Sequence, residues 1–227
     1  QQAFEHATDI QGFQPENISI IGNPRYAKYF IEREKKLKSK FNFNYILFIG
    51  TTLAYDESNC MVILDKIISK NKLDLKIVYR PHPWRQGRDS IIELNLKNII
   101  IDPQLINSYK IKDNSYNVQP DLNYYPSLLK NALFVVGGMS SMIIESLIFR
   151  KTYLALTHEE TNNNITSPSI VFKSYTHFDG LEKLNSVKLC HRIEELEQKL
   201  LFLLSNTTHN NVKLIDEEVD YYYSYDK

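Results

Sequence analysis

Short apolar runs alternate with amphipathic segments along most of the chain. Near-continuous apolar runs predict five buried strands, at residues 45–50, 75–79, 98–103, 133–138 and 152–156. Apolar residues at helical spacing predict helices at 57–70, 89–96, 124–132, 140–150 and 191–205. Strands that are apolar on both faces and alternate with helices favour an α/β fold with a doubly wound, mostly parallel, Rossmann-like sheet.

The remaining segments are less regular. A short apolar strand is expected at 18–21, before a Gly-Asn-Pro turn. Residues 26–40 carry charges at helical spacing, and their lysine run is typical of a solvated helix face. Two long loops, 104–122 and 157–170, follow expected strands, and loops of this kind at a ligand-binding edge are often lids or specificity loops. The acidic, Tyr-rich segment 207–227 is expected to be a frayed tail.

Composition narrows the classes of function. The chain has 227 residues, with 27 Lys+Arg against 27 Asp+Glu, so its net charge is zero and a general nucleic-acid binder is disfavoured. Cys60 and Cys190 are far apart, which indicates neither a zinc site nor a disulfide framework and fits a reducing cytoplasm. No run of about 18 apolar residues and no signal peptide is visible, so a cytoplasmic location is expected.

The predicted sheet indicates where a ligand would bind. Open α/β sheets bind ligands in the crevice outside the carboxyl ends of their strands. Five segments of this chain follow strands in that way: Gly50–Thr52, Tyr79–Arg85, Asp102–Pro103, Gly137–Ser141 and Leu156–Glu160.

The segment GGMSSMIIES places two glycines and two serines between a strand and a helix. Gly137 and Gly138 allow a tight turn and a close approach of the backbone to a ligand. Ser140 and Ser141 precede a helix, whose free N–H groups and dipole favour an anion such as phosphate. Glu145 lies about one turn further on and could accept hydrogen bonds from ribose hydroxyls. The simpler alternative is turn glycines, an N-cap serine and an exposed Glu145.

The segment RPHPWR follows the second strand of the regular pattern. His82 lies between two prolines, the second of which is Pro83, so its backbone has little freedom. Such a histidine suits hydrogen bonding to one ligand atom, for example a phosphate oxygen. Arg80 and Arg85 can neutralise a diphosphate or a sugar carboxylate. Trp84 can stack on a base or pack in the core.

Two further segments carry weaker signals. The backbone N–H groups and hydroxyls of Gly50, Thr51 and Thr52 could hold a phosphate or an acceptor, although a tight strand-to-helix turn explains them equally well. The segment 158–160, His-Glu-Glu, could contact the sugar end of a donor.

No Walker loop, GxGxxG or GxSxG motif is present, which argues against kinases, classical dehydrogenases and α/β-hydrolases. No metal site is predicted.

Four segments together resemble a known family: NISIIGNPRY, ILFIG, YRPHPWR and GGMSSMIIESLIFRKTYLAL. They are similar to the C-terminal, donor-binding half of GT-B fold glycosyltransferases, over roughly residues 15–205. The resemblance is strongest to bacterial surface-polysaccharide enzymes with CMP or CDP donors. These are sialyl- and polysialyltransferases, capsule Kdo transferases and CDP-glycerol polymerases of teichoic acid.

The resemblance implies roles for particular residues. The family's His-Pro motif falls on His82 and Pro83, and its serine pair falls on Ser140 and Ser141; both hold the donor's nucleotide and phosphate. Glu145 matches a helix acid that contacts ribose. His82 would stabilise the leaving phosphate electrostatically, which requires no metal. The nucleotide sugar is the substrate, and no cofactor is expected.

The same resemblance implies a division of the chain. Residues 1–40 would be the end of an N-terminal acceptor domain plus a linker, 41–206 the nucleotide-sugar-binding domain, and 207–227 a tail. The acceptor domain, expected before Gln1, would carry the general base, so the isolated chain is expected to be inactive. The expected partners are a nucleotide sugar and a glycan acceptor, in capsule or lipopolysaccharide synthesis. Peripheral association with the inner face of the plasma membrane is compatible with this role.

Two alternatives remain open. The first keeps the fold but changes the chemistry, to a UDP-sugar transferase or a UDP-GlcNAc 2-epimerase-like enzyme. The second is a non-catalytic nucleotide-binding or interaction module that retains the fold. Cytidine-selective binding that depends on His82 and Ser141 would favour a glycosyltransferase with a CMP or CDP donor over both alternatives.

Overall fold

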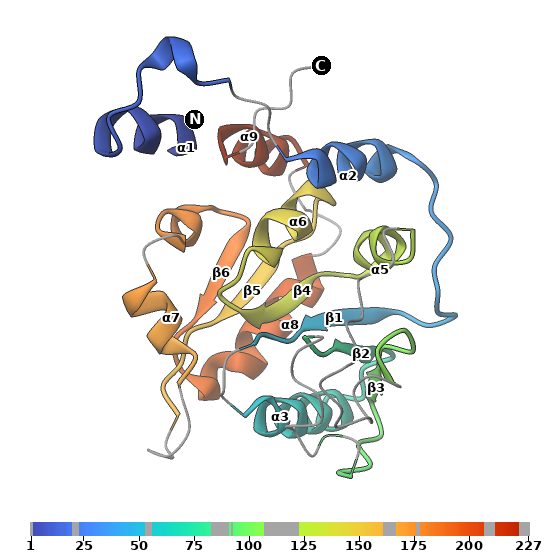
Figure 1. Ribbon diagram of the computed structural model, residues 1–227. Coiled ribbons are helices and arrows are strands. Elements are labelled where there is room, and N and C mark those ends of the chain that lie inside the picture. Colours follow the sequence, from blue (N-terminus) through green and yellow to red (C-terminus); the bar gives the residue numbers. More distant parts are fainter. Residues whose placement is uncertain are drawn as a thin grey trace.

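A six-stranded parallel sheet forms the centre of the molecule (Figure 1). The computed structural model describes residues 2–19, 23–52, 56–82, 91, 93–106, 123–160, 167–175, 178–206 and 212–222. The strands are β1 Tyr45–Ile49, β2 Lys76–Arg80, β3 Ile99–Ile101, β4 Val135–Gly138, β5 Tyr153–Leu156 and β6 Val187–Cys190. Their order in the sheet is β3-β2-β1-β4-β5-β6. The predicted doubly wound, Rossmann-like fold is confirmed.

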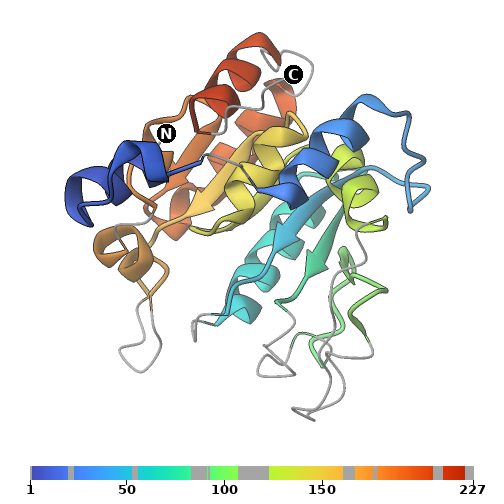
Figure 2. The same cartoon turned by 45° about the horizontal axis from the view of Figure 1, so that its top comes forward.

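Helices cover both faces of this sheet (Figures 1 and 2). The α-helices are α1 Gln2–Glu5, α2 Pro24–Glu34, α3 Glu57–Lys70, α5 Tyr125–Asn131, α6 Met142–Ile148, α7 Ser169–Ser174, α8 Leu196–Asn206 and α9 Val212–Tyr222. Shorter helical turns are η1 His6–Ile10, η2 Pro15–Asn17, η4 Leu181–Lys183 and η5 Ile193–Glu195. Helices α2, α5, α6 and α9 pack on one face, and α3 and α8 pack on the other. Among the described helices, none has the length and apolar character needed to cross a membrane.

Strand β1 shows why the strand sequences read as continuous apolar runs. Its side chains alternate between the two faces. Tyr45, Leu47 and Ile49 join the core beneath α2, α5 and α6. Ile46 and Phe48 join the core beneath α3 and α8. Because both faces are covered, every position of the strand is buried and apolar.

Strand β4 approaches β1 very closely at Gly137. A Cβ atom added at Gly137 would lie 2.5 Å from the Ile49 carbonyl oxygen and 2.6 Å from the Tyr153 hydroxyl. Both distances are shorter than real Cβ contacts allow, so a side chain here would push two central strands apart. The glycine is therefore needed for packing, whatever it does for a ligand.

Three predicted elements differ from the structure. The helix predicted at 26–40 ends at Glu34. The helix predicted at 89–96 is absent where the chain is described, because 91 and 93–96 form turns and irregular backbone and Asn95 has a positive φ of 45°. Of the strand predicted at 18–21, Ile18 and Ser19 are not in a strand, and the other two positions lie outside the described residues. In addition to these three, strand β6 is present although no strand was predicted there.

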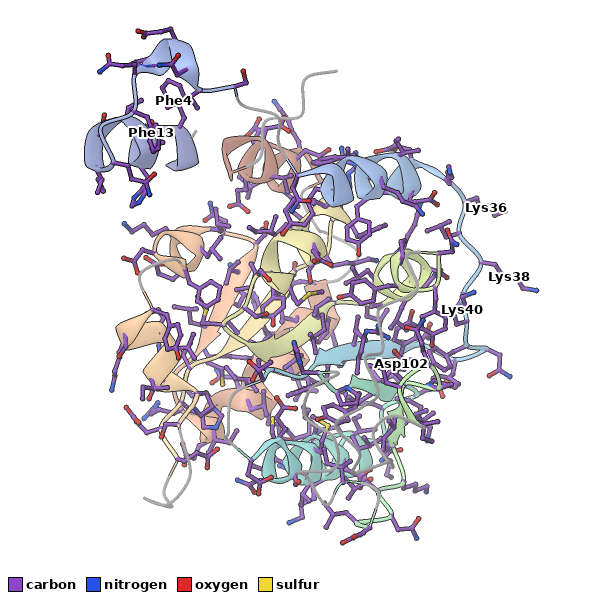
Figure 3. The ribbon with its side chains drawn as sticks, viewed as in Figure 1. Phe4, Phe13, Lys36, Lys38, Lys40 and Asp102 are labelled. Carbon is purple, nitrogen blue, oxygen red and sulfur yellow. The ribbon has the colours of Figure 1, made fainter. Side chains whose placement is uncertain are left out.

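The lysine run shows why the first of these predictions was wrong. After Glu34 the chain is extended, with Leu37 half-buried against the core while Lys36, Lys38 and Lys40 are exposed. Figure 3 shows the first two of these lysines pointing away from the body, between α2 and β1. The burial pattern therefore has a period of two instead of the helical period.

The segment expected to be a frayed tail contains a docked helix. Ile215 and Val219 of α9 are buried in the core that α2 and α6 share. The Asp216 carboxylate accepts hydrogen bonds from Arg33 (3.1 Å) and from Arg150 (2.9 Å). Apolar packing and this shared carboxylate fix α9 in place, so the acidic composition of the segment was misleading.

The N-terminal helical turns contrast with α9. Helix α1 and η1 stand apart from the sheet in Figure 1, and Figure 3 places Phe4 and Phe13 within this segment. Ile10 is 73% exposed and Phe13 is 56% exposed. These residues contribute little to the core.

We expect Gly137→Ala to destabilise the protein by about 1–3 kcal/mol, because the added methyl group overpacks the contact between β1 and β4. Urea denaturation followed by circular dichroism would measure the change. Ser205→Ala is the control that adds no bulk, since Ser205 is exposed near the end of α8 and its hydroxyl donates to the Phe202 carbonyl of its own helix. A loss at Gly137 no larger than at Ser205 would contradict the close approach.

Candidate functional site

The register of the sheet brings several loop starts together at the carboxyl edge. Ile49 of β1 pairs with Gly137 of β4 and with Arg80 of β2. The residues that follow four neighbouring strands are therefore side by side: Pro81, Gly50, Met139 and Thr157. The order of the strands reverses between β1 and β4, and sheets of this kind bind ligands at that switch point.

A buried carboxylate lies beneath the turn after β1. Glu57, the first residue of α3, is fully buried. The Thr51 N–H donates to its Oε1 at 2.8 Å, and the Tyr79 hydroxyl donates to its Oε2 at 2.6 Å. A Cβ added at Gly50 would lie 2.7 Å from the same Oε2. The Thr51 N–H, considered above for a phosphate, is thus already bound by a side chain of the protein.

Glu57 was not among the residues predicted from the sequence, although its place in the first turn of a helix is a local signal. Asp56 caps α3, with its carboxylate accepting the Ser58 N–H at 2.8 Å. Acidic residues are favourable in the first turn of a helix, where they interact with the positive end of its dipole. That preference accounts for Glu57 at the start of α3. Its inward direction and its bond to Tyr79 depend on the tertiary fold.

Arg80 is anchored by a second buried carboxylate. Its guanidinium forms a buried ion pair with Asp102, the residue after β3, and lies 4.8 Å from the Tyr125 ring centroid. Asp102 also accepts a hydrogen bond from the Tyr124 hydroxyl at 2.6 Å. Burial, followed by this hydrogen bond, raises the pKa of Tyr124. Figure 3 labels Asp102 on the β2–β3 side of the sheet.

His82 lies against the turn after β1. It is half-buried, and its backbone nitrogen would lie 3.1 Å from a Cβ added at Gly50. The glycine therefore lets the two loops approach each other. Thr52, next along the first loop, is exposed. Pro83 and Arg85 lie outside the described residues.

The turn after β4 carries two serines in different environments. The Gly138 carbonyl accepts the Tyr153 hydroxyl at 2.8 Å. Ser140 accepts the Met142 N–H through its Oγ at 3.3 Å. Ser141 is exposed at the N-cap position and makes no capping hydrogen bond within the described helix α6.

Glu145 is almost fully buried, with 1% of its surface exposed. The alternative that described it as an ordinary exposed residue is therefore wrong. A carboxylate in that position requires hydrogen-bond donors inside the protein or from a ligand, since burial of an unsatisfied charge is costly.

The segment after β5 holds a histidine and a carboxylate together. His158 is buried, and its Nε2 lies 3.2 Å from Glu160 Oε1. Its Nδ1 has no hydrogen-bond partner among the residues that the structure describes. Thr157 Oγ1 instead lies 2.9 Å from Nδ1 of His191, which follows β6. The sequence singled out this segment, but burial makes His158 a part of the interior.

The edge as a whole is polar and locally acidic. Three buried carboxylates lie along it, those of Glu57, Asp102 and Glu145, and Arg80 pairs with the second of them. Hydroxyls of Thr52 and Ser141 and the half-buried His82 complete the described set. Across the described part of the chain, no group of three or more His, Cys, Asp or Glu side chains could hold a metal ion. Such an edge can hydrogen-bond a ligand rich in hydroxyls and oxygens.

Known proteins resemble this chain in fold but not in sequence. No family model and no curated protein matches it. The wall teichoic acid polymerase TagF matches with a TM-score of 0.57 and 14% identity, over 97% of this chain and 51% of that one. A putative UDP-N-acetylglucosamine 2-epimerase from Listeria monocytogenes matches with a TM-score of 0.59 and 17% identity, over 95% and 52%. The chain thus spans about half the length of these structures.

We expect Arg80→Met to destabilise the protein by about 3–5 kcal/mol, because Asp102 would remain buried without its cation. The shift of the urea denaturation midpoint at constant m-value measures this. Lys70→Met is the matched control, since Lys70 pairs with Glu197 at the surface and its loss should cost less than about 1 kcal/mol. Equal costs for the two variants would argue against a structural role of the Arg80–Asp102 pair.

Proposed function

We propose that this chain is the donor-binding domain of a glycosyltransferase that uses a cytidine-nucleotide donor, CMP-linked or CDP-linked, to extend a surface polysaccharide. The observation that carries the proposal is the switch point between β1 and β4. There the Gly50 turn, the start of the His82 loop and the serine turn follow neighbouring strands at the edge where open α/β sheets bind ligands, in a fold similar to that of a teichoic acid polymerase. A further structure of that polymerase, with a TM-score of 0.56, was obtained after a soak with CDPG.

The proposal assigns roles to the residues around the crevice. His82 and the hydroxyls of Ser140 and Ser141 hydrogen-bond the donor phosphate, and Gly137 and Gly138 keep the backbone close to it. Glu145 is assigned to the ribose hydroxyls, and because only 1% of its surface is exposed, this contact requires the serine turn to open. The positions of Pro83 and Arg85 in the sequence, directly after His82, make them candidates for the same contacts.

The chemistry follows from the donor. When the sugar is transferred, the bond between its anomeric carbon and the phosphate oxygen breaks, and the phosphate leaves with the electron pair. Hydrogen bonds from His82 and the serines are then stronger in the transition state than in the ground state, because charge grows on that oxygen. The acceptor hydroxyl needs a general base, which we place outside this chain. The chain is therefore expected to bind the donor without transferring the sugar.

A second candidate is supported by the comparison with the epimerase, whose TM-score of 0.59 is similar to that of the polymerase. A UDP-sugar transferase or an epimerase-like enzyme would use the same crevice but would prefer uridine. A non-catalytic nucleotide-binding module would bind without either chemistry. The base preference and the effect of the loop variants distinguish these readings.

Isothermal titration with CMP, CDP, UMP and UDP tests the proposal. We expect the cytidine nucleotides to bind more tightly than the uridine nucleotides. His82→Ala and Ser141→Ala should each weaken binding of CMP by about tenfold or more, since hydrogen bonds to charged groups are worth about 1.5–3 kcal/mol.

His6→Ala and Ser205→Ala are the controls, because both residues are exposed, His6 in η1, which stands apart from the sheet, and Ser205 near the end of α8 (Figure 1). Uridine-selective binding would favour the second candidate. Binding that is insensitive to His82 and Ser141 would contradict the assigned site, and no binding of any nucleotide would contradict the proposed function.

A further inference from the structure

We infer that Glu57 is a specificity-determining residue of the donor site, whose fixed negative charge favours a nucleotide linked through one phosphate over a nucleotide linked through two. The inference rests on the proposed function, because it concerns the same crevice. It concerns the number of phosphates, which the proposed function leaves open.

The position of the Glu57 carboxylate is fixed. The side chain is fully buried, and its two oxygens accept hydrogen bonds from the Thr51 N–H at 2.8 Å and the Tyr79 hydroxyl at 2.6 Å. Both of these donors are neutral, and both stabilise the ionised form of the carboxylate. A Cβ added at Gly50 would lie 2.7 Å from Oε2, so the absence of a side chain at Gly50 makes room for the carboxylate directly beneath the turn.

The same contacts remove a phosphate-binding group from the crevice. A turn between a strand and a helix usually offers its backbone N–H groups to an anion. Here the Thr51 N–H points down to Glu57 instead of toward a ligand. A phosphate at this turn would lose that donor and would also lie within a few ångströms of a buried carboxylate.

The charge of Glu57 acts on a group beneath the turn after β4. Burial is the main cause of the raised pKa of Tyr153, and the nearby charge of Glu57 raises this pKa further, although a hydrogen bond with Ser140 lowers it. The Tyr153 hydroxyl donates to the Gly138 carbonyl, at the turn after β4. The carboxylate beneath the turn after β1 therefore lies close enough to the turn after β4 to influence it.

These observations lead to a division of the crevice. One phosphate can use the His82 loop and the serine turn, where hydroxyls remain at the described surface. A second phosphate that extends toward the turn after β1 would meet the carboxylate and would find the Thr51 N–H already bound, so that Thr52 is the exposed hydroxyl that the described part of this turn offers. Repulsion between like charges is strong where water is excluded. The turn after β1 thus discriminates against a diphosphate.

Glu57→Gln tests the inference with little change of shape. The glutamine oxygen can still accept the Thr51 N–H, and its amide nitrogen can donate to the Tyr79 oxygen. Isothermal titration with CMP and CDP is made on the natural chain and the variant, and with UMP and UDP in parallel. For each base, the ratio of the affinity for the monophosphate to that for the diphosphate measures the effect of the phosphate number independently of cytidine selectivity.

We expect the natural chain to bind the monophosphate at least as tightly as the diphosphate. In Glu57→Gln the affinity for the diphosphate should rise by about tenfold, while that for the monophosphate changes by less than about threefold. Asp74→Asn is the matched control: it removes one negative charge from an exposed position before β2, at the opposite edge of the sheet, and should leave both affinities unchanged.

Several outcomes would overturn the inference while the proposed function stands. One is a natural chain that binds the diphosphate tenfold more tightly than the monophosphate, a result that needs no variant. Another is a parallel change of both affinities in Glu57→Gln, which would indicate a purely structural role. A third is the same effect in Asp74→Asn. Binding of no nucleotide at all would overturn both proposals together.

Discussion

The close approach of β4 to β1 at Gly137 is the constraint on which the whole carboxyl edge depends. It places the turn after β1 beside the turn after β4, and those two turns define the switch point. The Tyr153 hydroxyl fills the remaining space and holds the Gly138 carbonyl, so the serine turn starts from a fixed backbone. With a larger residue at Gly137, the two strands would be pushed apart and the turns that follow them would separate.

Two buried carboxylates then fix the loops on the β1–β2–β3 side. Glu57 joins the turn after β1 to Tyr79, and Asp102 joins the end of β2 to the segment before α5 through Arg80 and Tyr124. Buried charges are costly unless donors satisfy them, and here each carboxylate has donors from two or more segments. These hydrogen bonds and the ion pair join the described loops of the edge, so several of its polar groups are committed to one another.

The sequence predicted the sheet because its central strands are covered on both faces, so that β1, β2, β4 and β5 have near-continuous apolar runs. Strand β6 gave a weaker signal, since Lys188 interrupts its short run at the edge. The loops at the switch point could be located from the sequence because open α/β sheets bind ligands outside the carboxyl ends of their strands. The partners of Glu57 and Arg80 could not be predicted, because they depend on contacts between distant segments, such as Arg80 with Asp102 across neighbouring strands.

Because the buried charged groups of this edge are paired with one another, they limit how a chain of zero net charge could bind an anion. Arg80 carries positive charge at the edge, but Asp102 neutralises it, and the buried acids make the surroundings negative. Under the proposed function, binding of a phosphate would depend on a few directed donors, such as His82 and the serine hydroxyls, instead of on surplus positive charge. A site of this kind is selective through geometry: each added phosphate has to find a donor of its own, and where none remains the acids beneath the edge oppose it.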